Sequence, residues 1–270
     1  MAEPVIVPAF NKKVRLSDYS PEYEGDLSKE DALALTDNYK TRIAEQQDVL
    51  YAQGKYALLI ILQAMDAAGK DSTIRHMLTG VNPQGVRVVS FKAPTPQELA
   101  QDFLWRVHQQ TPPKGFIGVF NRSHYEDVLV VRVNELVPER VWRKRYAHIN
   151  AFESLLADSG TRILKFYLNI SKAEQKKQLQ ERLEDPKKHW KFSMGDLPVR
   201  ARWADYMEAY EDAFSECHTP HAPWHIIPAN TRWYRNYIIA KTIAETLDDM
   251  KLSYPEPEAG FDPQKVIIED

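Results

Sequence analysis

The sequence predicts an α/β fold in which helices cover both faces of a parallel sheet. Five short apolar runs have the length of strands, and the stretches between them repeat apolar side chains every three or four residues. Continuous apolar runs are typical of strands buried on both faces, and strands that alternate with helices form parallel sheets. We therefore expect one domain with a central five-stranded parallel sheet, its strands at 56–62, 86–91, 116–120, 162–168 and 224–227.

The chain before the first predicted strand divides into an arm and a helix. Residues 1–26 are rich in Pro, Tyr and acidic side chains and show no periodicity, so we expect an extended arm. Ser28 followed by Asp31 is typical of a helix N-cap, and Gly54 ends the helical pattern. We expect an N-terminal arm and helix at 1–53, a core at 54–254 and a C-terminal tail at 255–270.

The stretches between the later strands predict helices that pack apolar stripes on the sheet. The stripes lie at 99–107, 141–156, 203–214 and 238–247. The third stripe is aromatic, and it contains Trp203, Tyr206, Tyr210 and Phe214. We interpret these four rings as core residues rather than as a stacking surface for a ligand, because apolar rings at helical spacing usually face the interior.

Composition excludes several classes of protein. The 270 residues are 43% hydrophobic and 27% charged, which is near the globular average and excludes a wholly disordered chain. The single cysteine, Cys217, excludes an internal disulfide and a Cys-rich zinc module. No run approaches about 18 apolar residues, and the N-terminus lacks the pattern of an export signal. We expect a cytoplasmic protein with no membrane partner.

The net charge of −3 hides an uneven distribution. The first 53 and last 28 residues together carry 18 acidic and 8 basic side chains, whereas residues 54–242 carry 20 acidic and 27 basic ones. Taken whole, the charge argues against a dedicated polyanion binder, and we expect no nucleic-acid partner. The middle of the chain has a local excess of +7 and contains every candidate phosphate ligand, so the whole-chain charge is too coarse to exclude a polyanionic partner.

The segment 63–73 follows the first predicted strand and leads directly into helical sequence, as a phosphate-binding P-loop does. Backbone N–H groups at the start of a helix bind oxyanions, and Lys70 would place an ammonium group on the phosphates. Ala64 and Asp71 depart from the general P-loop pattern, so an ordinary strand–turn–helix junction is the alternative. The candidate phosphate ligands of this loop are Ala67, Ala68, Gly69, Lys70, Asp71 and Ser72.

Carboxylates in and near this loop indicate a divalent cation. Asp66 would repel phosphates unless it held a metal or took a proton, and Mg²⁺ prefers carboxylate and phosphate oxygens together. Glu126 and Asp127 follow the third predicted strand, and of the two we favour Asp127 as a metal ligand. Arg122 suits a clamp on the transferred phosphoryl group. A polar helix cap is the alternative for the segment 120–127.

A basic segment follows the fourth predicted strand. A cation-rich hinge between two helices is where P-loop kinases carry a lid that closes over the substrate, so we expect a lid at about 171–200. A solvated basic loop is the alternative. The candidate phosphate ligands here are Arg182, Lys187, Lys188 and Lys191. Arg75 and Lys92 add positive charge near the expected phosphate side, and Lys92 ends the second predicted strand.

Taken together, these segments resemble the polyphosphate kinase 2 family, over about residues 50–254. The resemblance is carried by 65–71, 120–127 and 187–191 with Asp196, and by 80–85 and 228–235. The loop Gln63-Ala-Met-Asp66 is most similar to the subgroup called class III, which accepts both AMP and ADP. The resemblance implies a thymidylate-kinase-like, three-layer P-loop fold with a helical lid. It also implies reversible, Mg²⁺-dependent phosphoryl transfer between inorganic polyphosphate and a nucleotide.

The resemblance further implies roles for individual residues. Gly69 and Lys70 would hold phosphates, Asp66 and Asp127 would serve the metal and the nucleophile, and Arg122 would clamp the transferred group. From the lid, Arg182, Lys187 and Lys191 would close over the substrate. Asn121 and Glu126 would lie on the nucleotide side. The partners expected are polyphosphate and AMP, ADP or ATP, with Mg²⁺ or alternatively Mn²⁺ as cofactor, in a homo-oligomer that is a dimer or a tetramer.

Two other functions fit the same residues. An ATP-dependent nucleoside or nucleotide kinase would use the same fold, although ATP needs fewer cationic contacts than a long phosphate chain does. A non-catalytic phosphate- or nucleotide-binding regulator is the second alternative, but it would give Asp66 and Asp127 no purpose. Nucleotide formation from polyphosphate without added ATP would exclude both.

Overall fold

The computed structural model describes residues 6–266 and 268, and it contains a five-stranded parallel sheet. The strand order is β2-β3-β1-β4-β5, so β1 lies at the centre. Each strand starts and ends within one residue of the range predicted from the sequence, which confirms the predicted sheet. The strands are β1 (Ala57–Gln63), β2 (Val86–Ser90), β3 (Ile117–Asn121), β4 (Thr161–Asn169) and β5 (Trp224–Pro228).

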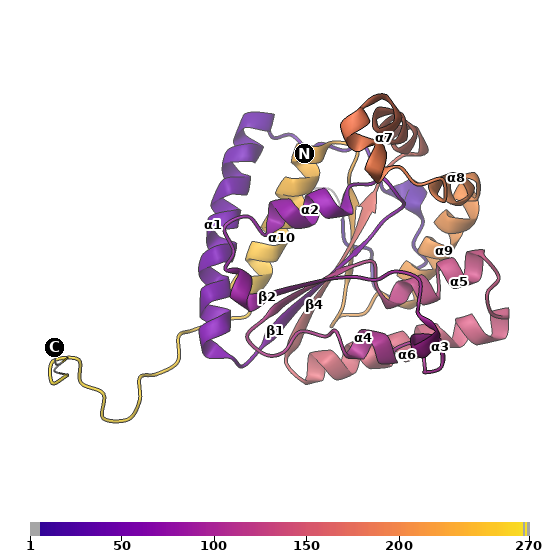
Figure 1. The fold of residues 1–270 in the computed structure, drawn as a ribbon. Coiled ribbons are helices and arrows are strands. Elements are labelled where there is room, and N and C mark those ends of the chain that lie inside the picture. The colour runs from indigo at the N-terminus through magenta and orange to yellow at the C-terminus, as the bar shows by residue number, and fades with distance from the viewer. Residues whose placement is uncertain (1–5, 267, 269–270) are drawn as a thin grey trace.

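Helices cover both faces of the sheet, which makes a three-layer fold (Figure 1). On one face lie α1 (Lys29–Gln53), α2 (Lys70–Met77) and α10 (Arg232–Asp249). On the other lie α4 (Trp105–His108), α5 (Val130–Val133), α6 (Glu139–Asp158) and α9 (Trp203–Glu216), with α3 (Pro96–Leu99) nearby. Short 3₁₀ helices are Leu16–Asp18, Pro83–Gly85, His124–Asp127 and Pro186–Lys191. Each layer buries an apolar cluster against its face of the sheet.

The predicted start and end of the first long helix are confirmed. Ser28 is the N-cap, and its side chain accepts a hydrogen bond from the Asp31 backbone N–H at 3.1 Å. Gly54 ends the helix in the left-handed conformation at φ 61°. The stripe predicted at 99–107 is wrong as a single helix. A new helix begins at Trp105, where Asp102 Oδ1 accepts hydrogen bonds from the backbone N–H groups of Leu104 and Trp105, and Leu99 is 68% exposed.

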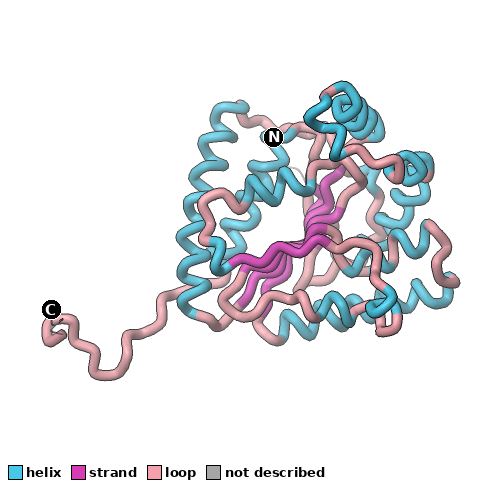
Figure 2. Tube along the Cα trace, in the orientation of Figure 1, coloured by secondary structure: helices cyan, strands magenta, loops and turns pink. Residues whose placement is uncertain are grey.

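The N-terminal arm packs on its own chain. The Ile226 N–H donates to the carbonyl of Ile6 at 2.7 Å, so the arm lies along the outer edge of β5. Further along, the Val14 N–H bonds to Ser215 on α9 at 2.9 Å. A strand edge left open is a site of aggregation, and the arm covers this one. At the other end, residues 253–266 and 268 form neither helix nor strand, and this part of the chain runs away from the body (Figure 2).

A segment that spans α7 (Lys172–Glu184), the 3₁₀ helix Pro186–Lys191 and α8 (Asp196–Ala201) occupies the region predicted as a lid. It stands beyond the carboxyl ends of the strands (Figure 1). Among the residues that the structure describes, no helix is both long enough and apolar enough to cross a membrane.

A buried ion pair joins the sheet to the helices behind it. Lys165 on β4 and Glu153 on α6 are both fully buried, and Nζ lies 2.6 Å from the carboxylate. Lys165 also donates to the hydroxyl of Tyr125, and His124 lies 3.1 Å from Glu153. Burial alone would raise the pKa of Glu153, but Lys165 and His124 outweigh burial and lower it. The pair therefore holds the turn that contains His124 and Tyr125.

We expect Lys165→Met to lower the free energy of unfolding by about 3–5 kcal/mol, because it leaves the Glu153 carboxylate buried without its cation. The double variant Lys165→Met with Glu153→Gln should lose less than the sum of the two single variants. Lys114→Met, at an exposed position, is the control and should change stability by less than about 0.5 kcal/mol. Urea unfolding measures the four variants and the wild type. Equal losses at Lys165 and Lys114 would contradict the role of the pair.

Candidate active site

The loop between β1 and α2 has the geometry of a phosphate-binding loop. The chain leaves β1 at Gln63, and α2 begins at Lys70 after Gly69, which takes a φ of 96°. Ala67 also has a positive φ, of 64°, so the loop is held in a sharp turn. Lys70 Nζ donates to the carbonyl of Ala64 at 2.9 Å. Burial lowers the pKa of Lys70, and Asp66 opposes that change.

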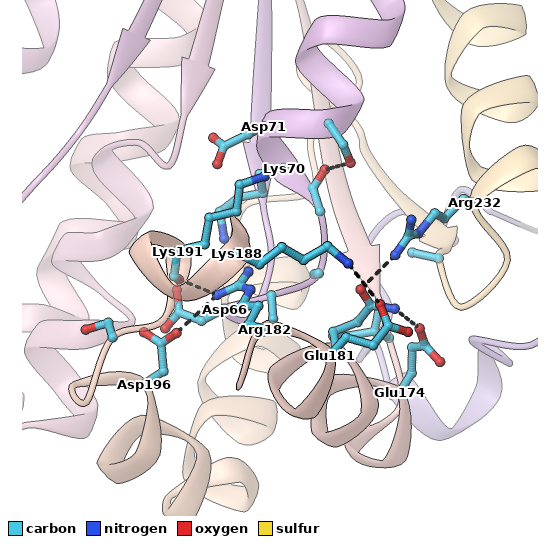
Figure 3. Close-up of a pocket in the computed structure, with 18 of the residues that line it drawn as sticks. Asp66, Lys70, Asp71, Glu174, Glu181, Arg182, Lys188, Lys191, Asp196 and Arg232 are labelled. Carbon is cyan, nitrogen blue, oxygen red and sulfur yellow. Dashed lines mark hydrogen bonds and ion pairs between the residues drawn. The ribbon is translucent and has the colours of Figure 1, made fainter. Parts of the chain in front are cut away.

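A large polar cavity of about 450 Å³ opens above this loop. Figure 3 shows that side chains from the loop and from the lid segment point into it from opposite sides. A cavity with so many cationic side chains suits a polyanionic ligand. Those cationic side chains are Lys70, Arg122, Arg182, Lys188, Lys191, Arg232 and Arg235.

A smaller cavity of about 170 Å³ adjoins the first and shares Asp66 and Arg122 with it. Its wall is largely apolar and aromatic, with Glu126 as a further acid. Tyr206 and Tyr210, predicted as core residues, are buried in the core and also line this cavity. The other lining residues are Ala64, Met65, Leu129, Val130, Asn134 and Val199.

An ion pair marks the boundary between the two cavities. Arg122 Nη2 lies 2.7 Å from Asp66 Oδ1. Arg122 has a φ of 62°, and its N–H donates to the Leu62 carbonyl at 3.0 Å, so the residue after β3 is tied to the end of β1. Burial alone would lower the pKa of Arg122, but the carboxylates of Glu126 and Asp66 raise it. The predicted clamp residue is thus positioned where the cavities meet.

Glu126, rather than Asp127, faces this boundary. Glu126 lines the smaller cavity, and burial raises its pKa although Arg122 and Lys70 oppose the rise. Asp127 lines neither cavity. Its Oδ1 accepts a hydrogen bond from Arg145 at 3.1 Å, and its Oδ2 lies 4.0 Å from Arg106.

Glu126 and Asp127 have different surroundings because both lie in a 3₁₀ helix, where neighbouring side chains point about 120° apart. Only one of two consecutive acids can therefore face the boundary. Burial raises the pKa of Asp127 to about 6, even though Arg145 and Arg106 favour its charged form. The metal role predicted for Asp127 stays a prediction.

The structure brings together only some of the other predicted phosphate ligands. Asn121, Asp71 and Ser72 line the large cavity, and Asn121 donates to Asp71 Oδ1 at 2.7 Å. From the lid segment, Arg182, Lys188 and Lys191 line it as well, as do Ala67, Ala68 and Gly69 from the loop. Three predicted cations, Arg75, Lys92 and Lys187, lie outside the lining of both cavities.

Arg235 is a site residue to which sequence reasoning gave no role. It lies on α10, is buried, and donates to the Ala68 carbonyl at 3.2 Å and to Ser72 Oγ at 3.3 Å. Burial lowers its pKa to about 10, and Arg232 adds to that shift. It lies close behind Gly69, and a Cβ on Gly69 would lie 2.5 Å from Arg235 Nη1, so a side chain there requires the guanidinium to shift. The sequence signal that could have identified Arg235 as a site residue is its position shortly after the fifth predicted strand.

Within residues 6–266 and 268, no three or more His, Cys, Asp or Glu side chains are grouped so that they could hold a metal ion. Asp66 is suited to contact an ion that enters the site with phosphate, since its side chain is 19% exposed and lines both cavities. A carboxylate with phosphate oxygens and water is a common ligand set for Mg²⁺.

Comparison with known proteins places this site in context. A family model described as polyphosphate kinase 2 matches residues 26–255. An AMP/ADP-polyphosphate phosphotransferase of Meiothermus ruber is 55% identical over 252 residues, which cover 93% of each chain. An ADP-polyphosphate phosphotransferase of Rhodopseudomonas palustris is 47% identical, covering 87% of this chain and 85% of the relative. The crystal structure of a polyphosphate kinase 2 from Arthrobacter aurescens TC1 superposes with a TM-score of 0.91 and 45% identity, covering 96% of this chain and 92% of the other.

We expect Gly69→Ala to destabilise the fold more than Gly80→Ala, which is a matched control. Both glycines have a positive φ, of 96° and 86°, but only at Gly69 would the added Cβ meet Arg235. Gly80→Ala should cost about 1–2 kcal/mol from backbone strain alone. Gly69→Ala should cost at least about 1 kcal/mol more, because Arg235 must give up its hydrogen bonds to the loop. Urea unfolding measures both, and equal losses would contradict the contact.

Proposed function

This chain belongs to the polyphosphate kinase 2 family, and from that premise we propose that it transfers a phosphoryl group between inorganic polyphosphate and AMP or ADP, forming ADP or ATP reversibly. The observation that carries the proposal is the pair of cavities that meet at Asp66 and Arg122. One cavity is lined by cations and the other is largely apolar, so a polyanionic donor and a nucleotide acceptor can approach the same two side chains.

The larger cavity is the proposed polyphosphate site. A phosphate chain carries about one negative charge per unit, and the cations of the loop and the lid lie on opposite sides of the cavity (Figure 3). Lys70 and the N–H groups at the start of α2 would bind the end phosphoryl group, with Arg182 and Lys191 on the units behind it. An ATP-dependent kinase needs fewer such contacts, and the names of the relatives favour polyphosphate.

The smaller cavity is the proposed acceptor site. Tyr206 and Tyr210 offer aromatic surface for a nucleoside, and Arg122 stands where the terminal phosphate of AMP or ADP would lie. A phosphate oxygen is already ionised at neutral pH, so the reaction needs no strong base. The main task of the site is to bring two anions together. Lys70 and Arg122 reduce that repulsion at the point where the cavities meet, which makes electrostatic stabilisation the principal catalytic effect.

A divalent cation is part of the proposal. Asp66 would hold the cation on the large-cavity side. Glu126, rather than Asp127, would be the second carboxylate near the cation, because Glu126 lines the smaller cavity. When bound, Mg²⁺ neutralises charge on the phosphate oxygens and holds them in line. Mn²⁺ accepts the same oxygen ligands and is the alternative ion. The cytoplasmic location and the homo-oligomeric state expected from the sequence stay predictions.

We expect the wild-type protein to form ADP and ATP from polyphosphate, Mg²⁺ and AMP with no ATP added, and Lys70→Ala to lower kcat by at least about 10², the scale of one lost transition-state contact. Chromatography of the nucleotides measures both. Lys114→Ala, which removes an exposed cation outside both cavities, is the control and should keep wild-type turnover. No nucleotide formation by the wild-type protein would refute the proposed function, and normal turnover in Lys70→Ala would remove that lysine from it.

The two consecutive acids can be separated by matched substitutions. Glu126→Gln should lower kcat/KM for AMP at least about tenfold, because it removes the second carboxylate proposed to lie beside the divalent cation. Asp127→Asn should lower it less than about threefold, because its carboxylate contacts Arg145 and Arg106 outside both cavities. Initial rates at saturating polyphosphate and varied AMP give kcat/KM for both variants. A larger loss of kcat/KM in Asp127→Asn than in Glu126→Gln would instead support Asp127 as the metal ligand.

A further inference from the structure

The large cavity contains more carboxylates than an anion site needs. Five acidic side chains line it alongside the cations: Asp66, Asp71, Glu174, Glu181 and Asp196. Negative charge in such a cavity opposes the binding of a phosphate chain, so each acid requires a reason. Asp66 pairs with Arg122, and Asp71 accepts a hydrogen bond from Asn121.

The two acids on α7 have local partners on the lid. Glu174 accepts a hydrogen bond from Gln178 at 2.7 Å, one turn along the helix. Glu181 lies 3.9 Å from Lys188, which is 44% exposed. Asp196 does not lie on α7, so these local contacts do not account for its place in the cavity.

Asp196 begins α8 and reaches across to α7. Its Oδ2 lies 3.5 Å from Arg182 Nη1, and the two side chains are only 15% and 21% exposed. Figure 3 shows the two side chains pointing toward each other, with Asp66 and Lys191 close by. Burial raises the pKa of Asp196, and the charge of Asp66 adds to that rise. The carboxylate therefore lies within electrostatic reach of the reacting end of the cavity.

Arg182 does not need Asp196 to hold its orientation. The same Nη1 donates a hydrogen bond of 2.9 Å to the carbonyl of Lys191, which fixes the guanidinium beneath the 3₁₀ helix of the lid. At 3.5 Å, Asp196 contributes attraction between charges rather than a short, directional bond. A phosphate oxygen that approaches Arg182 would meet both the cation and this competing anion.

On the basis of the proposed function, we propose that Asp196 competes with the polyphosphate chain for Arg182 and thereby limits how tightly the lid holds that chain. The site transfers one phosphoryl group and leaves a donor that is still a long polyanion. Without Asp196, Arg182 would meet the chain with no acid competing for it, and the cavity would release the donor more slowly. An acid placed on the lid weakens the contact and offers Arg182 another partner as the chain departs. Asp196 thus sets the affinity of the site for the donor.

The test is Asp196→Asn, which keeps the size of the side chain and removes its charge. We expect KM for polyphosphate, and the Kd for polyphosphate in calorimetric titration without acceptor, to fall about three- to tenfold, because one repulsive charge is removed at a partly buried pair. KM for AMP should stay unchanged, because Asp196 does not line the smaller cavity. Asp196→Glu, which keeps the charge, should resemble the wild type.

Two further variants keep the result interpretable. Asp196→Ser removes the charge with a residue that suits a helix start, and it should tighten binding in the same direction if the Asn variant folds poorly. Asp205→Asn removes an exposed acid paired with Arg202 outside both cavities, and it should leave polyphosphate affinity unchanged. Thermal unfolding checks that each variant is folded.

Each outcome has a distinct meaning. Tighter polyphosphate binding in Asp196→Asn and Asp196→Ser, with Asp205→Asn unchanged, supports the competition. Unchanged or weaker binding in the two charge-removing variants would overturn it, and weaker binding would make Asp196 a residue that positions Arg182. A wild-type protein that makes no nucleotide from polyphosphate would refute the proposed function itself, whereas an active wild type with unaltered Asp196 variants would refute only this inference.

Discussion

The ion pair between Asp66 and Arg122 is the contact on which the site depends. It exists because β1 and β3 are parallel neighbours, with Leu62 in register with Asn121, so the two loops that follow these strands leave the sheet side by side. Arg122 then turns back through a positive φ and bonds to the Leu62 carbonyl. The register of two strands thereby sets the distance between the loop that binds phosphate and the side chain that faces both cavities.

Much of this arrangement could be predicted from the sequence, because it depends on local pattern. Buried parallel strands give continuous apolar runs, and Gly69 and Lys70 directly after such a run indicate a phosphate-binding loop. Which of Glu126 and Asp127 lines the smaller cavity could not be predicted, because it depends on the turn geometry of a short 3₁₀ helix. Arg235 was given no role, because it reaches the loop from a helix more than 160 residues away.

The rest of the molecule supports this edge of the sheet. Lys165, Glu153 and Tyr125 form a buried polar cluster that fixes the turn carrying Glu126, and Arg235 fixes the loop from behind. Buried charges of this kind are costly unless they are paired, so each is held by several partners. At the cavity, cations from the loop and the lid lie beside acids. The site therefore balances attraction for a polyanion against its release.

The central claim is that donor and acceptor occupy the two cavities together and that the phosphoryl group passes directly between them. Initial rates measured against polyphosphate at several fixed concentrations of AMP test this claim most directly. Direct transfer in a ternary complex predicts double-reciprocal lines that intersect. Parallel lines, the kinetic pattern of a covalent phosphoenzyme that forms before the acceptor binds, would contradict it.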